Sequence, residues 1–234
     1  MLRDTIKTRG LHAAVRFAPR AALDKAHKQQ FMLKAGEGFD WRRQEFADQA
    51  WQLTSPQEEG DPRSQLKLTI NPEMVQFEDY FPTGSLDLFV DNLRLALDSF
   101  AAVFDPKVIL ASGIVVRLTA QSEPQDARVF LGQHCLHLDD RLHPLKRPVH
   151  AVGLKLLLPP LPGPEQPAWQ AEVKVESLVE DIRQLFIEVN GQWASPVPVT
   201  WEPSVLVDRV RTVHDFATRQ VVDFLVQLGH GEPR

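Results

Sequence analysis

The sequence predicts an α+β protein in which an antiparallel sheet packs against two long amphipathic helices. Three observations support this fold class. Apolar and polar residues alternate in several short segments, which is typical of half-buried strands. Two other segments, 84–106 and 204–229, repeat apolar residues every three or four positions, which is typical of helices with one buried face. The pair Asn190-Gly191 is a strong signal of a two-residue hairpin turn.

The first part of the chain predicts a strand, a helix and a second strand. Segment 10–19 (GLHAAVRFAP) is the first strand and ends in proline, and segment 20–36 is a helix closed by glycine. Segment 50–54 (AWQLT) is a further strand. The polar segment 55–64, which contains two prolines and a glycine, predicts a loop.

The middle of the chain predicts a β-hairpin followed by a long helix. Segment 65–70 alternates apolar with polar residues, Asn71-Pro72-Glu73 supplies the turn, and segment 74–79 returns as the second strand. The helix begins after Ser85, whose hydroxyl group can cap the first turn, and it ends before Pro106.

The remaining segments predict strands, a second hairpin and a terminal helix, at residues 107–120, 150–160, 170–177, 184–197 and 204–229. A strand pair followed by a long helix therefore occurs twice, around residues 65–104 and 171–228, which makes a duplicated β-hairpin/helix arrangement an option. We assign residues 1–148 to an N-terminal α+β half. Residues 149–234 form a C-terminal half with a β-hairpin and a long helix, and one continuous domain is the alternative.

Composition excludes several classes of protein. Hydrophobic residues make up 43% of the chain, enough for a buried core without a disulfide or metal staple. The single cysteine, Cys135, excludes an intramolecular disulfide and a cysteine-based zinc cluster. It fits a reducing compartment, and we expect the cytoplasm. No apolar run of about 18 residues is present, so no membrane span is expected.

Charge is distributed unevenly along the chain. The formal net charge is −5, yet the first 36 residues are basic and the remainder is acidic. Four cations of this basic segment are candidates for contacts with nucleic acid: Arg16, Arg20, Lys25 and Lys28. The alternative is a solvated face that balances acidic surface elsewhere in the fold. The negative charge of the whole chain opposes non-specific binding to phosphate.

Segment 132–150 (GQHCLHLDDRLHPLKRPVH) concentrates histidine and aspartate. It offers four candidate metal ligands for a metal-dependent enzyme: His134, His137, Asp139 and His143. A helix and a strand would select different ligand sets from this segment, and neither yields a pair of histidines four residues apart around a glutamate. The alternative is one or two short helices on a sheet, with the histidines on their polar side.

Three tryptophans lie near the second predicted hairpin. Trp169, Trp193 and Trp201 are candidates for partner binding, because aromatic side chains dominate the energetics of protein interfaces. The alternative is packing at the edge of the core. No phosphate-binding glycine motif and no nucleophile motif occurs, so the sequence predicts no catalytic residue and no cofactor.

Five segments carry a resemblance to a known family: VRFAP, FEDYF, GIVVRLTA, RPVHAVGLKLLLP and VDRVRTVHDFATRQVVDFL. The chain resembles a sporadically distributed, functionally uncharacterised bacterial family with β-hairpin/long-helix halves. The resemblance implies a bacterial, cytosolic protein and no assigned catalysis, and it transfers no site residue. The arginine-rich strand of the family is represented here only by Arg117.

These observations predict a non-enzymatic binding or assembly protein that acts through protein–protein contacts. Its partner is expected to be another protein or a second copy of the chain. A metal-dependent enzyme that uses segment 134–150 is the first alternative, and nucleic-acid binding through the basic N-terminal segment is the second.

Overall fold

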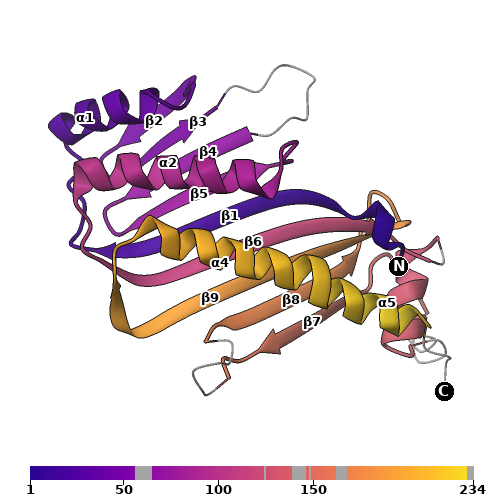
Figure 1. Ribbon diagram of the computed structural model, residues 1–234. Helices are drawn as coiled ribbons and strands as arrows, with labels where there is room; N and C mark the ends of the chain where they lie inside the picture. The colour runs from indigo at the N-terminus through magenta and orange to yellow at the C-terminus, as the bar shows by residue number, and fades with distance from the viewer. Residues whose placement is uncertain (56–64, 124, 139–145, 148, 162–167, 231–234) are drawn as a thin grey trace.

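The computed structural model describes residues 1–55, 65–123, 125–138, 146–147, 149–161 and 168–230. Its main feature is an antiparallel sheet of nine strands in the order β2-β3-β4-β5-β1-β6-β9-β8-β7 (Figure 1). The strands are β1 (Lys7–Ala18), β2 (Arg43–Ala47), β3 (Ala50–Thr54), β4 (Gln65–Asn71), β5 (Met74–Tyr80), β6 (Val108–Gln121), β7 (Gly153–Leu158), β8 (Gln170–Ser177) and β9 (Gln184–Thr200).

The main described helices lie on one face of this sheet (Figure 1). The longer helical elements are α1 (Lys25–Gly36), α2 (Leu86–Phe104), α4 (Pro203–Asp215), η4 (Phe216–Val221) and α5 (Val222–His230). The short ones are η1 (Arg3–Thr5), α3 (Ala127–Val129) and η2 (Phe130–Cys135). α4, η4 and α5 follow one another without a break and form one long C-terminal helix, in which η4 is a π-helical turn.

The centre of the sheet is formed by two strands that are far apart in the sequence. β1 pairs with β5 on one side and with β6 on the other, where Leu11 lies opposite Val116. β6 then pairs with β9. One sheet therefore contains strands from both sides of the predicted boundary between residues 148 and 149.

The predicted fold class, a sheet against two long helices, is wrong. The single long helix is the C-terminal one, from Pro203 to His230. α2 is shorter, and α1 packs beside it in the same layer, although few of the α1 side chains are apolar and only Phe31 and Ala35 are buried. A duplicated β-hairpin/helix arrangement does not describe the sheet either, because its two central strands lie outside both hairpins. Local periodicity carries no information about such long-range pairing.

The turn predicted at Asn190-Gly191 is also wrong. β9 runs straight through both residues, and Gly191 lies opposite Ile114 of β6 and Ala171 of β8. A Cβ atom on Gly191 would collide with the side chain of Val213 on α4 and press against the Trp169 ring. The glycine is therefore required for close packing of a helix on the sheet, and not for a turn.

The local predictions for the middle of the chain are confirmed. β4 and β5 form the expected hairpin, with Asn71 opposite Met74. The Ser85 hydroxyl group caps α2 by accepting a hydrogen bond from the backbone N–H of Leu88 at 3.2 Å. α2 ends at Asp105, which adopts a left-handed conformation before Pro106.

Alternate residues of each strand face the helices and form the core, while their neighbours point to the other face. Fully buried side chains on the helical face include Leu68, Phe77, Val116 and Ile187. The other face carries polar and charged side chains in register across the strands, for example His12 opposite Glu78 and Arg117 opposite Glu188.

Candidate partner-binding site

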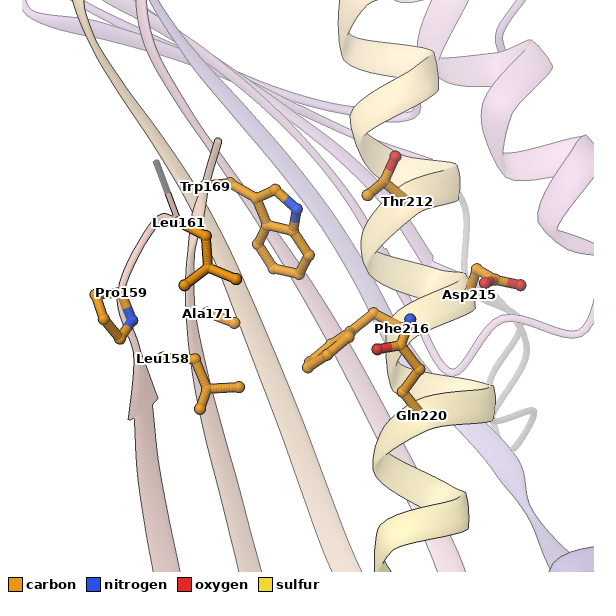
Figure 2. A pocket seen from close by; sticks show the side chains of 9 residues that line it. All are labelled: Leu158, Pro159, Leu161, Trp169, Ala171, Thr212, Asp215, Phe216 and Gln220. Atoms are coloured by element: carbon orange, nitrogen blue, oxygen red, sulfur yellow. The ribbon is translucent and has the colours of Figure 1, made fainter. Parts of the chain in front are cut away.

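An apolar groove lies between the C-terminal helix and the last strands of the sheet, and Figure 2 shows the side chains that line it. Its volume is about 550 Å³, within the usual range for binding pockets. One wall is built from the end of β7, the segment that follows it and the start of β8: Leu158, Pro159, Leu161, Trp169 and Ala171. The other wall is the C-terminal helix, through Thr212, Asp215, Phe216 and Gln220.

Two aromatic rings meet at right angles in this groove. The centroids of the Trp169 and Phe216 rings are 5.3 Å apart with an interplanar angle of 89°, an edge-to-face contact of the kind that aromatic pairs prefer. Trp169 is only 9% exposed, so its ring is fixed in place. The pair therefore forms a rigid apolar surface that joins the strand wall to the helix wall.

The Trp169 ring also packs against Trp193 of β9. The two rings stack with centroids 5.3 Å apart and an interplanar angle of 20°. The Arg209 guanidinium lies 5.1 Å from the Trp193 ring centroid and donates a hydrogen bond to the Ser112 hydroxyl group at 2.7 Å. Burial lowers the pKa of Arg209 from its ordinary value. A cation on an aromatic face is attractive, so this contact braces the groove.

The polar residues of the groove all come from the helix wall. Asp215 forms an ion pair with Arg219 one turn later, at 2.8 Å. Phe216 begins the π-helical turn, in which an extra residue widens the helix. The groove therefore offers an apolar floor with a carboxylate, an amide and a hydroxyl group along one rim, a combination that suits a polypeptide better than a purely apolar ligand.

The groove adjoins an exposed edge of the sheet. β7 is the last strand, and no strand in the described part of the chain pairs with its outer side. Its sequence is GLKLLL, and the side chains of Leu157 and Leu158 are 59% and 40% exposed. Leu161, which follows β7, is also exposed. Unpaired backbone groups beside exposed leucines make this edge suitable for pairing with another strand.

The opposite edge of the sheet differs in character. β2 has the sequence RQEFA, and Arg43 and Glu45 form an ion pair on its exposed side at 2.7 Å. Charged side chains on an edge strand oppose the addition of a further strand. The chemistry of the two edges therefore makes β7 better suited than β2 to pairing with another strand.

The structure brings together two of the three predicted tryptophans. Trp169 and Trp193 are stacked in and behind the groove. Trp201 lies elsewhere and packs against Phe17 and Phe100, with ring centroids 6.1 and 5.6 Å away. It takes part in the main core, the alternative that the sequence left open.

Sequence reasoning missed the rest of the groove. The apolar stripe predicted for the C-terminal helix includes Ala217 but not its neighbour Phe216. The stripe therefore does not indicate which way the Phe216 side chain points. The sequence pattern predicts the leucines of β7 to be ordinary strand residues, because it does not show that β7 is an edge strand. The one available signal was the run of three leucines directly before a proline-rich segment.

The predicted metal ligands lie only partly within the described residues. His134 is in η2, near the Phe130 ring, and His137 has a left-handed backbone with φ 51°. Asp139 and His143 lie outside the described residues. In the described part of the chain no three histidine, cysteine, aspartate or glutamate residues are placed to hold a metal ion. Burial raises the pKa of the nearby Cys135 thiol to about 11.

The four predicted basic residues lie on β1, on α1 and in the segment between them, and contacts within the chain are seen for Arg16, Arg20 and Lys28. Arg16 and Arg20 both approach Glu73, at 3.6 and 3.4 Å. Lys28 lies over the Phe46 ring, 3.7 Å from its centroid, and Lys25 begins α1. Three of the four cations therefore have a contact within the fold, and binding of nucleic acid by these residues stays a prediction.

A polar cluster lies on the opposite face of the sheet. Glu78 accepts a hydrogen bond from the Tyr80 hydroxyl group at 2.8 Å and has His12 Nδ1 and Lys67 Nζ at 4.0 and 3.9 Å. Burial lowers the pKa of His12, an effect that Glu78 opposes and that the positive charges of Arg117 and Lys67 reinforce. Burial also raises the pKa of Tyr80, as does its hydrogen bond to Glu78.

Comparison of the chain with models of known protein families and with curated protein sequences finds no match. The family resemblance of the sequence therefore stays a prediction. Of the helices that the structure describes, none combines the length and apolar character needed to cross a membrane.

Proposed function

We propose that the protein binds another polypeptide by adding a strand of that partner to the outer edge of β7. The observation that carries this proposal is the coincidence, at one corner of the sheet, of an exposed edge strand and a groove of about 550 Å³. Strand addition supplies main-chain hydrogen bonds, and an adjacent pocket supplies selectivity for particular side chains. The proposal concerns a binding or assembly protein, most simply one of the cytoplasm, as its single cysteine favours.

The side chains of β7 set the chemistry of the bound segment. Leu154, Leu156 and Leu158 point to the helical face, and Lys155 and Leu157 to the other. A strand added beside β7 contacts both sets, because its own side chains alternate in the same way. An apolar side chain near Leu158 would reach the mouth of the groove, against Trp169 and Phe216.

The rim of the groove favours a bound main chain. Thr212, Asp215 and Gln220 lie on the helix wall in Figure 2, where the Phe216 ring points toward the strand wall and the Asp215 carboxylate points away from it. The Thr212 hydroxyl group donates to the Asp208 carbonyl oxygen at 2.8 Å, and Asp215 pairs with Arg219. The Thr212 oxygen can still accept a hydrogen bond, and the Gln220 amide can donate and accept, so both can pair with polar groups of a peptide that would otherwise lose their contacts with water. The expected partner segment is therefore extended, apolar at alternate positions, and free of acidic residues near Asp215.

A peptide-binding assay tests this function. The probe is a fluorescein-labelled peptide of alternating leucine and threonine with a lysine at each end, and the readout is fluorescence anisotropy. Thr212→Trp fills the groove from an exposed position. We expect this substitution to weaken binding by at least about tenfold, which corresponds to ~1.4 kcal/mol.

The matched control is Arg211→Trp. Arg211 is the neighbouring residue on α4 but points to α2, where it pairs with Asp87 at 2.7 Å. It adds the same bulk outside the groove, so peptide affinity should stay within about twofold of the wild-type value. Equal affinities for all three proteins, or no binding by any of them, would contradict the proposed function.

A further inference from the structure

We infer that the strand added to β7 is β7 of a second copy of the same chain, so that two sheets join into one across a twofold axis. This inference rests on the proposed function and names its partner. The faces, charges and exposure of five residues, Leu154 to Leu158, determine how two such strands can pair.

The faces of the sheet restrict the register of such a pair. Directly opposite residues in an antiparallel pair point to the same face, and a slip of one residue reverses every side chain. A symmetric pair must therefore place one residue opposite its own copy. The longest symmetric pairings place either Lys155 or Leu156 opposite its own copy, and each of them pairs five residues of β7 with five residues of the second copy.

Charge selects between these two registers. With Lys155 at the centre, the two lysines would lie opposite each other, which is destabilising. With Leu156 at the centre, Leu154 lies opposite Leu158 of the second copy, and Lys155 lies opposite Leu157 of the second copy. A third register, centred on Leu157, would bring Pro159 into the pairing, and proline has no N–H group to donate.

The selected register covers the apolar surface that one chain leaves exposed. On the helical face, three leucines from each copy form a continuous row that ends beside the groove at Leu158. On the other face, Leu157, which is 59% exposed, is covered by the aliphatic stem of Lys155 from the second copy. Lys155 keeps its own ion pair with Glu172, at 2.9 Å. No buried unpaired charge results from this pairing.

Two substitutions of Leu157 test both the dimer and its register. Leu157→Lys places a lysine opposite Lys155 of the second copy, and Leu157→Glu places a carboxylate there. Both remove the same exposed leucine, so they differ only in charge. Within one chain the preference is reversed, because position 157 lies opposite Glu172 of β8. An effect within the monomer therefore cannot imitate the expected result.

Sedimentation equilibrium supplies the readout. We expect a concentration-dependent dimer for the wild-type chain, and a dissociation constant at least about tenfold lower for Leu157→Glu than for Leu157→Lys, because symmetry repeats the cross-strand pair twice. The double variant Lys155→Glu/Leu157→Lys should recover the dimer lost in Leu157→Lys. A wild-type chain that stays monomeric at every concentration reached, or equal dissociation constants for the two charge variants, would overturn the inference.

The peptide assay separates this inference from the proposed function. If the chain stays monomeric but binds the alternating peptide in a manner sensitive to Thr212→Trp, the second copy is not the partner and the proposed function stands. If neither dimer nor peptide binding is observed, both fail. A dimer that responds to the charge at position 157 as expected supports both.

Discussion

At the residue scale, we expect the burial of His12 to make the stability of the fold depend on pH. Burial is the main reason that its pKa lies below the ordinary value in the folded chain. The folded state therefore binds a proton at His12 less readily than the unfolded state does. The contribution of neutral His12 to the free energy of unfolding is fully present above the pKa of histidine in the unfolded chain, about 6.5. It decreases as the pH falls below that value, until the pH passes the pKa of His12 in the folded chain.

We expect His12→Gln to weaken this dependence on pH. The free energy of unfolding, measured by urea denaturation, should fall less between about pH 7.5 and pH 5 in the variant than in the wild-type chain. Some dependence should remain, because burial also lowers the pKa of His214. An unchanged pH profile would mean that His12 is not held in its neutral form by the fold.

Two glycines of the central sheet give a second prediction at this scale. Gly191→Ala should lower the free energy of unfolding by about 1–3 kcal/mol, because its Cβ atom would overlap Val213 and Trp169. Gly113→Ala is the matched control in the neighbouring strand, where a Cβ atom meets open space. It should be neutral or stabilise by up to about 1 kcal/mol. Similar losses for both variants, measured by thermal or urea unfolding, would contradict the packing described for Gly191.

At the element scale, α2 depends on its N-terminal cap. Replacing Ser85 with alanine removes the acceptor for the Leu88 N–H group and should cost about 1 kcal/mol of unfolding free energy. Ser85→Asp keeps a capping oxygen and should stay close to the wild-type stability in the same urea titration. If Ser85→Ala and Ser85→Asp lose stability equally, the cap is not what the hydroxyl group provides.

The sequence predicts those helices and strands whose pattern lies within a few neighbouring residues. Alternation predicted β4 and β5, and the apolar repeat with its capping serine predicted α2. The turn predicted at Asn190-Gly191 is wrong because this dipeptide also occurs in a strand that a helix approaches closely. Proximity in the sequence groups Trp169, Trp193 and Trp201 around a hairpin that does not form, and the structure brings only the first two together. Phe216 could not be assigned, since the π-helical turn shifts the face that it presents.

At the scale of the whole molecule, the sheet order could not be predicted. β1 and β6 pair across the middle of the chain, and this pairing determines which strands become edges. The position of the proposed binding surface follows from that order, because β7 is the last strand of the sheet. The helices cover one face of the sheet (Figure 1), so a strand added at β7 extends the same layered arrangement.

The proposed function requires the outer edge of β7 to accept another strand. The decisive measurement is hydrogen–deuterium exchange of the backbone amides with and without saturating alternating peptide, at a protein concentration low enough to keep the chain monomeric. We expect slower exchange in β7, with β2 at the opposite edge unchanged as an internal control. Unchanged exchange in β7, or equal slowing at both edges, would contradict it.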